Sequence, residues 1–108
     1  MIVPQITAKS KEDFIEKVQN GDLELARAVI RTVIRNLNAK DQNFIVAEIS
    51  FEDEGESYEL SCHSDEFILT LEKNLKVLVE AEAYEECTKV ASALKYLKSD
   101  NQSYDVQI

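Results

Sequence analysis

The spacing of apolar residues changes twice along this chain of 108 residues, and no other feature constrains the fold as much. Apolar residues recur at helical intervals over 10–37 and again over 65–98, which indicates amphipathic helices. Over 43–63 they alternate with polar residues, as in half-buried strands. The pattern predicts an α+β fold in which two α-helical hairpins flank a central antiparallel β-hairpin, followed by a tail over 99–108. A chain of this length suits one domain, so we expect 1–108 to form a single domain.

Capping residues predict where the helices begin and turn. Ser10 is a good N-cap for the first helix, and Gly21 suits the left-handed end of a short helix. Asp22 can then cap a second, longer helix. Ser64 and Asp65 are placed to cap the helical segment that follows the strands.

The β segment has apolar residues on both of its expected faces. Strict alternation places one set on a single face: Ile45, Ala47, Ile49 and Phe51. Phe44 and Val46 would then lie on the opposite face. Two strands alone are marginal in water, so the hairpin needs a further strand. We expect it from Ile2–Ile6, from Tyr104–Ile108 or from a second copy, and we favour a homodimer.

The last helical segment, 65–98, contains a distinctive sequence pattern, with a turn expected over 81–83. Spaced leucines, acids and an aromatic–Glu pair occur in this order: Leu71, Leu75, Leu78-Val79-Glu80, Glu82, Tyr84-Glu85, Cys87-Thr88, Val90, Leu94 and Leu97. Segment 71–97 resembles the UVR motif of nucleotide-excision-repair proteins and certain bacterial stress-response adaptors. It departs from that motif at Ala91-Ser92, where the family usually carries Arg-Asp. The resemblance implies a helical hairpin that docks onto another protein.

Acidic residues are concentrated on the β segment. The chain has a net charge of −9, and no Lys or Arg lies between Lys40 and Lys73. These 32 residues contain ten acids. A strong negative potential steers a basic partner toward such a surface. The predicted partner-binding residues are Glu48, Glu52, Asp53, Glu54, Glu56, Tyr58 and Glu59.

These features favour binding over catalysis. We interpret the chain as a small, acidic, non-enzymatic adaptor or inhibitor, of the kind that phages and mobile elements encode, with a basic protein surface as its partner. Tyr58 and Phe44 would add apolar contact at the centre of the interface. One alternative is a DNA mimic that inhibits a nucleic-acid-binding enzyme. Another is that the acids only keep the protein soluble and protect the edges of the hairpin.

A cationic stripe balances part of this charge. Arg27, Arg31 and Arg35 recur every four residues, so they share one face of the predicted second helix. They can pair with acids of the same chain or with a second copy. The stripe is too small, within so acidic a chain, to predict direct binding of nucleic acid.

The residues available for metal or thiol chemistry are few. Cys62 and Cys87 are the two cysteines, and His63 is the single histidine. Together they are one ligand short of a closed zinc site, and neighbours on a strand point to opposite faces. A thiol or metal enzyme using these three residues is therefore the least favoured alternative. We expect no metal site and no cofactor.

Two further expectations concern location. The chain has no apolar run long enough to span a membrane. Its N-terminus lacks the basic region and long apolar stretch of a secretory signal. We therefore expect a cytoplasmic protein that does not bind membranes.

Overall fold

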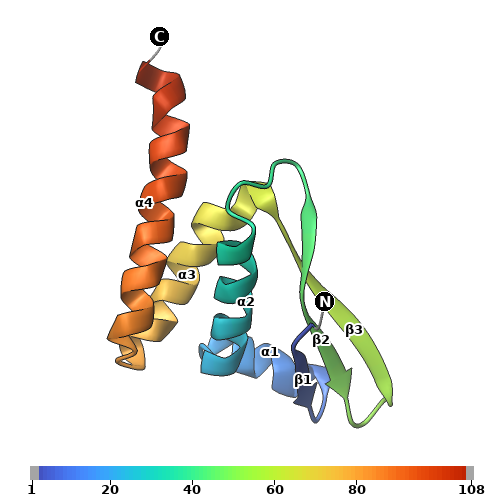
Figure 1. Cartoon of the computed structure of the whole chain (residues 1–108). Coiled ribbons are helices and arrows are strands. Elements are labelled where there is room, and N and C mark those ends of the chain that lie inside the picture. Colours follow the sequence, from blue (N-terminus) through green and yellow to red (C-terminus); the bar gives the residue numbers. More distant parts are fainter. Residues whose placement is uncertain (1–2, 107–108) are drawn as a thin grey trace.

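The structure of the chain, a computed structural model, describes residues 3–106, with side chains as far as residue 99. It is an α+β fold, as predicted (Figure 1). Its elements in chain order are β1 (Gln5–Ala8), α1 (Lys11–Gln19), α2 (Leu23–Arg35), β2 (Asn43–Phe51), β3 (Glu56–His63), a short 3₁₀ helix (Ser64–Glu66), α3 (Phe67–Glu80) and α4 (Tyr84–Val106).

The sheet has three strands in the order β1-β2-β3. The predicted antiparallel hairpin over 43–63 forms as β2 and β3, but the sheet is mixed because β1 pairs with β2 in parallel. Ile6 of β1 lies opposite Ile49, and both are buried. The third strand thus comes from the same chain, which removes the reason for expecting a second copy to complete the sheet. Ile2 and Ile108, parts of the two expected terminal strands, lie outside the described residues.

The predicted faces of β2 are partly wrong, because the strand contains a bulge. Ile45 lies opposite Ser61 and Ala47 lies opposite Leu60, so Val46 is an extra residue without a partner on β3. The extra residue shifts the alternation by one position. Val46 and Ala47 are consequently both buried, while Ile45 is 44% exposed on the other face. Phe44 also belongs to the core side, where its ring packs on Phe67 at 5.9 Å.

The helices lie on one face of the sheet, in layers (Figure 1). α2 packs on β2 and on α3, and α3 packs on α4. α1 packs on β1, with Phe14 set edge-on against Phe51 at 6.1 Å. The structure therefore does not confirm two helical hairpins flanking the β-hairpin, because α1 contacts the sheet rather than running alongside α2. The apolar stripes pack into one core that includes Val33, Leu71 and Leu78.

Several local predictions are confirmed. The side chains of Ser10 and Asp22 cap α1 and α2 by accepting backbone N–H bonds, and Gly21 has a φ of 75°. The prediction that Ser64 and Asp65 cap the following helix is wrong. Ser64 Oγ accepts the N–H of Gln42 across the hairpin, and Asp65 donates its own N–H to a side chain.

The expected tail is helical over much of its length. α4 continues to Val106, so the loop or strand predicted from position 99 onward is wrong. The sequence holds no glycine or proline after Gly55 that would end the helix. Within residues 3–106, no helix combines the length and the apolar character needed to cross a membrane.

Candidate functional site

The tip of the β-hairpin gathers carboxylates around one tyrosine. The Tyr58 hydroxyl donates to Glu56 at 2.8 Å and lies 3.3 Å from a carboxylate oxygen of Glu54. Lys11, from the start of α1, lies 3.7 Å from Glu54 and 5.3 Å from the centre of the Tyr58 ring. The ring itself packs on Phe51. A rigid aromatic residue therefore holds two of the predicted acids at the end of the sheet, with one cation nearby.

The other predicted acids lie on different sides of the hairpin. Glu52 and Asp53 are exposed in the turn between the strands. Glu48 and Glu59 lie opposite each other on the open face of the sheet, away from the helices. Like charges at directly opposed positions destabilise a sheet. The seven predicted residues thus share one ribbon but do not form one flat surface.

The apolar part of the predicted interface is smaller than expected. Tyr58 is 41% exposed at the tip, so part of its ring is accessible. Phe44 is at the other end of β2 and packs on Phe67 instead. Phe44 is therefore part of the core rather than the centre of a docking surface.

The hydrogen bond from the Tyr58 hydroxyl to Glu56 raises the pKa of Tyr58 from 10.0 to about 12, with Glu54 adding to the effect. We predict that Glu56→Gln moves this pKa back toward 10.0. The phenolate absorbance is followed against pH, and the signal of Tyr58 is the difference from the titration of a Tyr58→Phe variant. Because the folded pKa is the higher one, the stability from this bond is present below pH 10.0 and is lost as pH rises through about 12. The matched change Glu80→Gln on α3 leaves the titration unchanged. If Tyr58 titrates at the same pH in the wild type and in Glu56→Gln, Glu56 is not the cause of the raised pKa.

The predicted cationic stripe is partly neutralised within the chain. Arg27 Nε donates to both carboxylate oxygens of Glu86, at 3.0 and 2.9 Å, and so ties α2 to α4. These bonds raise the pKa of Arg27 and lower the pKa of Glu86. Arg31 and Arg35 remain exposed beside a groove of about 620 Å³ between the two helices. The first of the alternatives for this stripe, pairing within the chain, therefore holds for Arg27.

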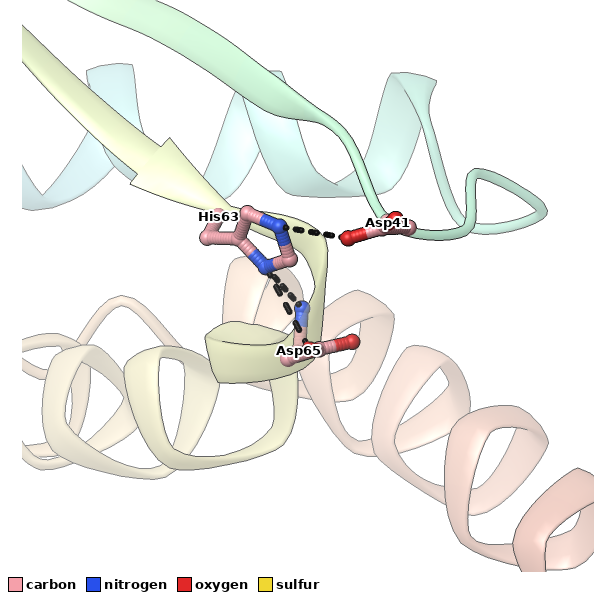
Figure 2. Close-up of side chains that lie close together, drawn as sticks. All are labelled: Asp41, His63 and Asp65. Atoms are coloured by element: carbon pink, nitrogen blue, oxygen red, sulfur yellow. Dashed lines mark hydrogen bonds and ion pairs between the residues drawn. The ribbon is translucent and has the colours of Figure 1, made fainter.

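His63 lies between two aspartates at the other end of the hairpin. Its Nδ1 accepts the N–H of Asp65 at 3.1 Å, and its Nε2 lies 3.4 Å from Asp41 (Figure 2). Carboxylates and imidazole nitrogens can bind divalent metals. One ligand atom from each of Asp41, His63 and Asp65 lies within 4.8 Å of the others. Both aspartates are exposed and lie beside different ring nitrogens (Figure 2). The hydrogen bonds that His63 makes point to a structural role.

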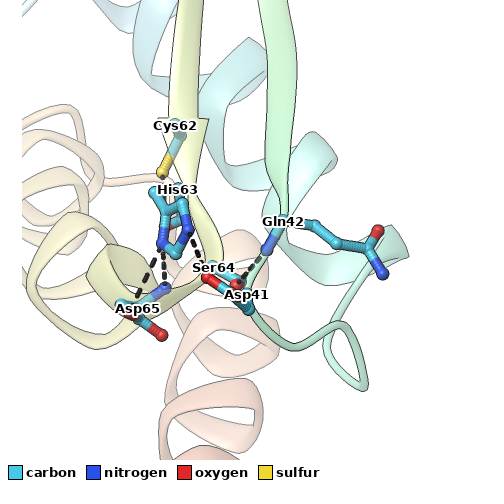
Figure 3. Close-up of polar contacts among 6 residues, drawn as sticks. All are labelled: Asp41, Gln42, Cys62, His63, Ser64 and Asp65. Atoms are coloured by element: carbon cyan, nitrogen blue, oxygen red, sulfur yellow. Dashed lines mark hydrogen bonds and ion pairs between the residues drawn. The ribbon is translucent and has the colours of Figure 1, made fainter.

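The surrounding contacts support that structural role. Gln42 donates its N–H to Ser64 Oγ at 3.1 Å, and Ser64 donates its N–H to the carbonyl of Gln42 at 2.8 Å (Figure 3). His63 accepts the first free N–H of the 3₁₀ helix. Together these bonds close the hairpin and start the helical segment that leads to α3.

Sequence reasoning missed Asp41 and Asp65 as neighbours of His63. The signal was the hairpin register, because Asn43 pairs with His63 and the residues just outside that pair must meet. The two thiols are the residues of the least favoured alternative, a thiol or metal enzyme. Cys62 lies with its Sγ 3.6 Å from Thr70 Oγ1, and both Cys62 and Cys87 are unpaired thiols.

No protein-family model, curated protein or solved structure matches the chain.

Proposed function

We propose that this chain is a small acidic protein-binding module, an adaptor or inhibitor, that docks through its β-hairpin onto a basic surface of another protein. The observation that carries the proposal is the group of carboxylates at the hairpin tip. Glu52, Asp53 and Glu56 have no cation within 4.0 Å among the described residues, and Glu54 has only Lys11. Unneutralised charge of one sign raises the on-rate for an oppositely charged partner.

The position of the tip supports this use. The turn projects at the free end of the sheet, away from α3 and α4 (Figure 1). Tyr58 places an exposed aromatic ring beside the acids, and tyrosine is enriched among residues that dominate binding energy. The UVR resemblance of 71–97 supports the same class of function, with the α3–α4 pair as a second docking unit. The cytoplasm suits a chain with two free thiols.

The test is a charge reversal at the tip, in which four acids become lysine: Glu52, Asp53, Glu54 and Glu56. We expect the variant to lose the proteins that the wild-type chain captures from lysate at low salt, while thermal unfolding stays close to that of wild type. Salt weakens the wild-type capture, because exposed charges are screened beyond about 10 Å at 0.1 M.

A control variant reverses the same number of exposed acids outside both the tip and segment 71–97: Glu12, Glu16, Glu24 and Glu66. It changes the net charge equally, so it should keep capture if the tip is the docking surface. Equal loss in both variants would mean that net charge alone retains those proteins. Displacement of the captured protein by duplex DNA would favour the DNA-mimic alternative instead.

A further inference from the structure

In the part of the chain that the structure describes, the outer edge of β3 has no neighbouring strand. β3 is the last strand of the sheet, and β2 covers only one of its edges (Figure 1). Alternate backbone N–H and C=O groups of a strand point toward each edge. Among residues 3–106, no other element makes a hydrogen bond to the backbone of residues 57–62.

Of the usual protections against pairing, this edge has only acidic side chains. Proteins shield free edges with charged residues, above all lysine, with proline, with bulges or with very short strands. β3 is eight residues long, twice the length of β1, and contains no lysine or proline. The bulge of the sheet lies on β2 and leaves the outer edge of β3 regular.

The charge along the edge selects the kind of strand that can pair with it. Glu59 is exposed on the open face of β3, where Glu48 lies opposite it on the neighbouring strand, whereas Glu56 lies on the other face beside Tyr58. A second copy of this acidic chain would add like charges to the open face and be repelled. A strand with basic residues would instead relieve the repulsion between Glu48 and Glu59.

The face that points toward the helices offers room for apolar side chains. Tyr58 and Leu60 are partly exposed on that face of β3. A hollow of about 420 Å³ lies between the strand and α3, and its lining includes Leu60, Cys62, Thr70 and Val77. A strand added to β3 would point every second side chain toward this face.

We propose that the outer edge of β3 binds an extended segment of another protein in which basic and apolar residues alternate, by adding it to the sheet as a fourth strand. This inference rests on the proposed function and names its partner and mode of binding. The basic residues lie on the open face beside Glu59, and the apolar residues lie beside Tyr58 and Leu60. The backbone supplies affinity and the alternating side chains supply specificity.

The experiment compares three peptides as long as β3 in which Lys alternates with Val. The first is unmodified, the second is N-methylated on alternate nitrogens and keeps one edge able to pair, and the third is methylated on every nitrogen. All three carry the same charge. We expect the first two to bind and the third to bind about tenfold more weakly or worse, because it loses several backbone hydrogen bonds.

Amide hydrogen exchange and variants locate the binding site. The bound peptide should slow exchange on β3 while leaving β1 unchanged. Glu59→Lys should weaken binding several-fold, whereas Glu16→Lys on α1 makes the same change in net charge and should not. Equal affinity for all three peptides, or protection elsewhere than β3, overturns the inference.

The two proposals fail in different ways. If no peptide binds but reversal of the tip acids still abolishes protein capture, the edge inference is wrong and the acidic docking surface stands. If no peptide binds and the reversed variant captures the same proteins as wild type, both are wrong.

Discussion

Leu71→Ala should destabilise the protein by about 3 kcal/mol, because it deletes buried methyl groups and leaves a cavity. Leu71 is fully buried in the middle of α3, where it belongs to the core shared by the helices and the sheet. A loss of this size is a large fraction of the roughly 5–15 kcal/mol that stabilises a typical domain. Denaturant unfolding monitored by circular dichroism measures it from the shift in the midpoint.

The same helix provides the matched control. Leu69 is 55% exposed, so Leu69→Ala makes the same chemical change with the same effect on helix propensity. We expect a change within about 0.5 kcal/mol for this variant. Equal losses at the two positions would mean that α3 does not pack with Leu71 inward.

Gly21→Ala should cost about 2 kcal/mol, from backbone strain and from a close contact. Gly21 has a φ of 75°, which L residues with a side chain rarely adopt. An added Cβ would lie 3.1 Å from Val77 Cγ2 on α3, and a β-branched residue in a helix has little freedom to rotate away. The free energy of unfolding, again from denaturant titration, measures the loss.

Gly55→Ala separates the two contributions. Gly55 has a similar φ of 66°, but an added Cβ would meet nothing within 4 Å. We therefore expect only the backbone cost, about 1 kcal/mol. If Gly55→Ala is as costly as Gly21→Ala, the contact between the α1–α2 turn and α3 contributes nothing.

Local chemistry explains which predictions succeeded. A cap such as Ser10 or Asp22 accepts a bond from a residue three positions ahead, and Gly21 adopts a conformation that its own lack of a side chain permits. Such features depend on neighbours in the sequence alone. The change from helical spacing to alternation likewise placed the β-hairpin correctly, because each period reports one buried face.

Pairing between distant residues explains which predictions failed. The bulge at Val46 depends on the register of β2 against β3, so alternation alone placed Phe44 and Val46 on the wrong face. Asp41 and Asp65 meet His63 only because that register brings the two ends together. Arg27 and Glu86 are 59 positions apart and meet only because α4 packs near α2.

The amino-acid order by itself determined the α+β class, the hairpin over 43–63, the turn at Gly21, and the acidity of the ribbon. Each of these follows from hydrophobic period, backbone freedom or charge within a short window. Only the tertiary structure decided that β1 completes the sheet, that Glu48 and Glu59 share the open face, and that no described residue pairs with the outer edge of β3. These depend on strand order and register, which arise from the free energy of burying the whole core together.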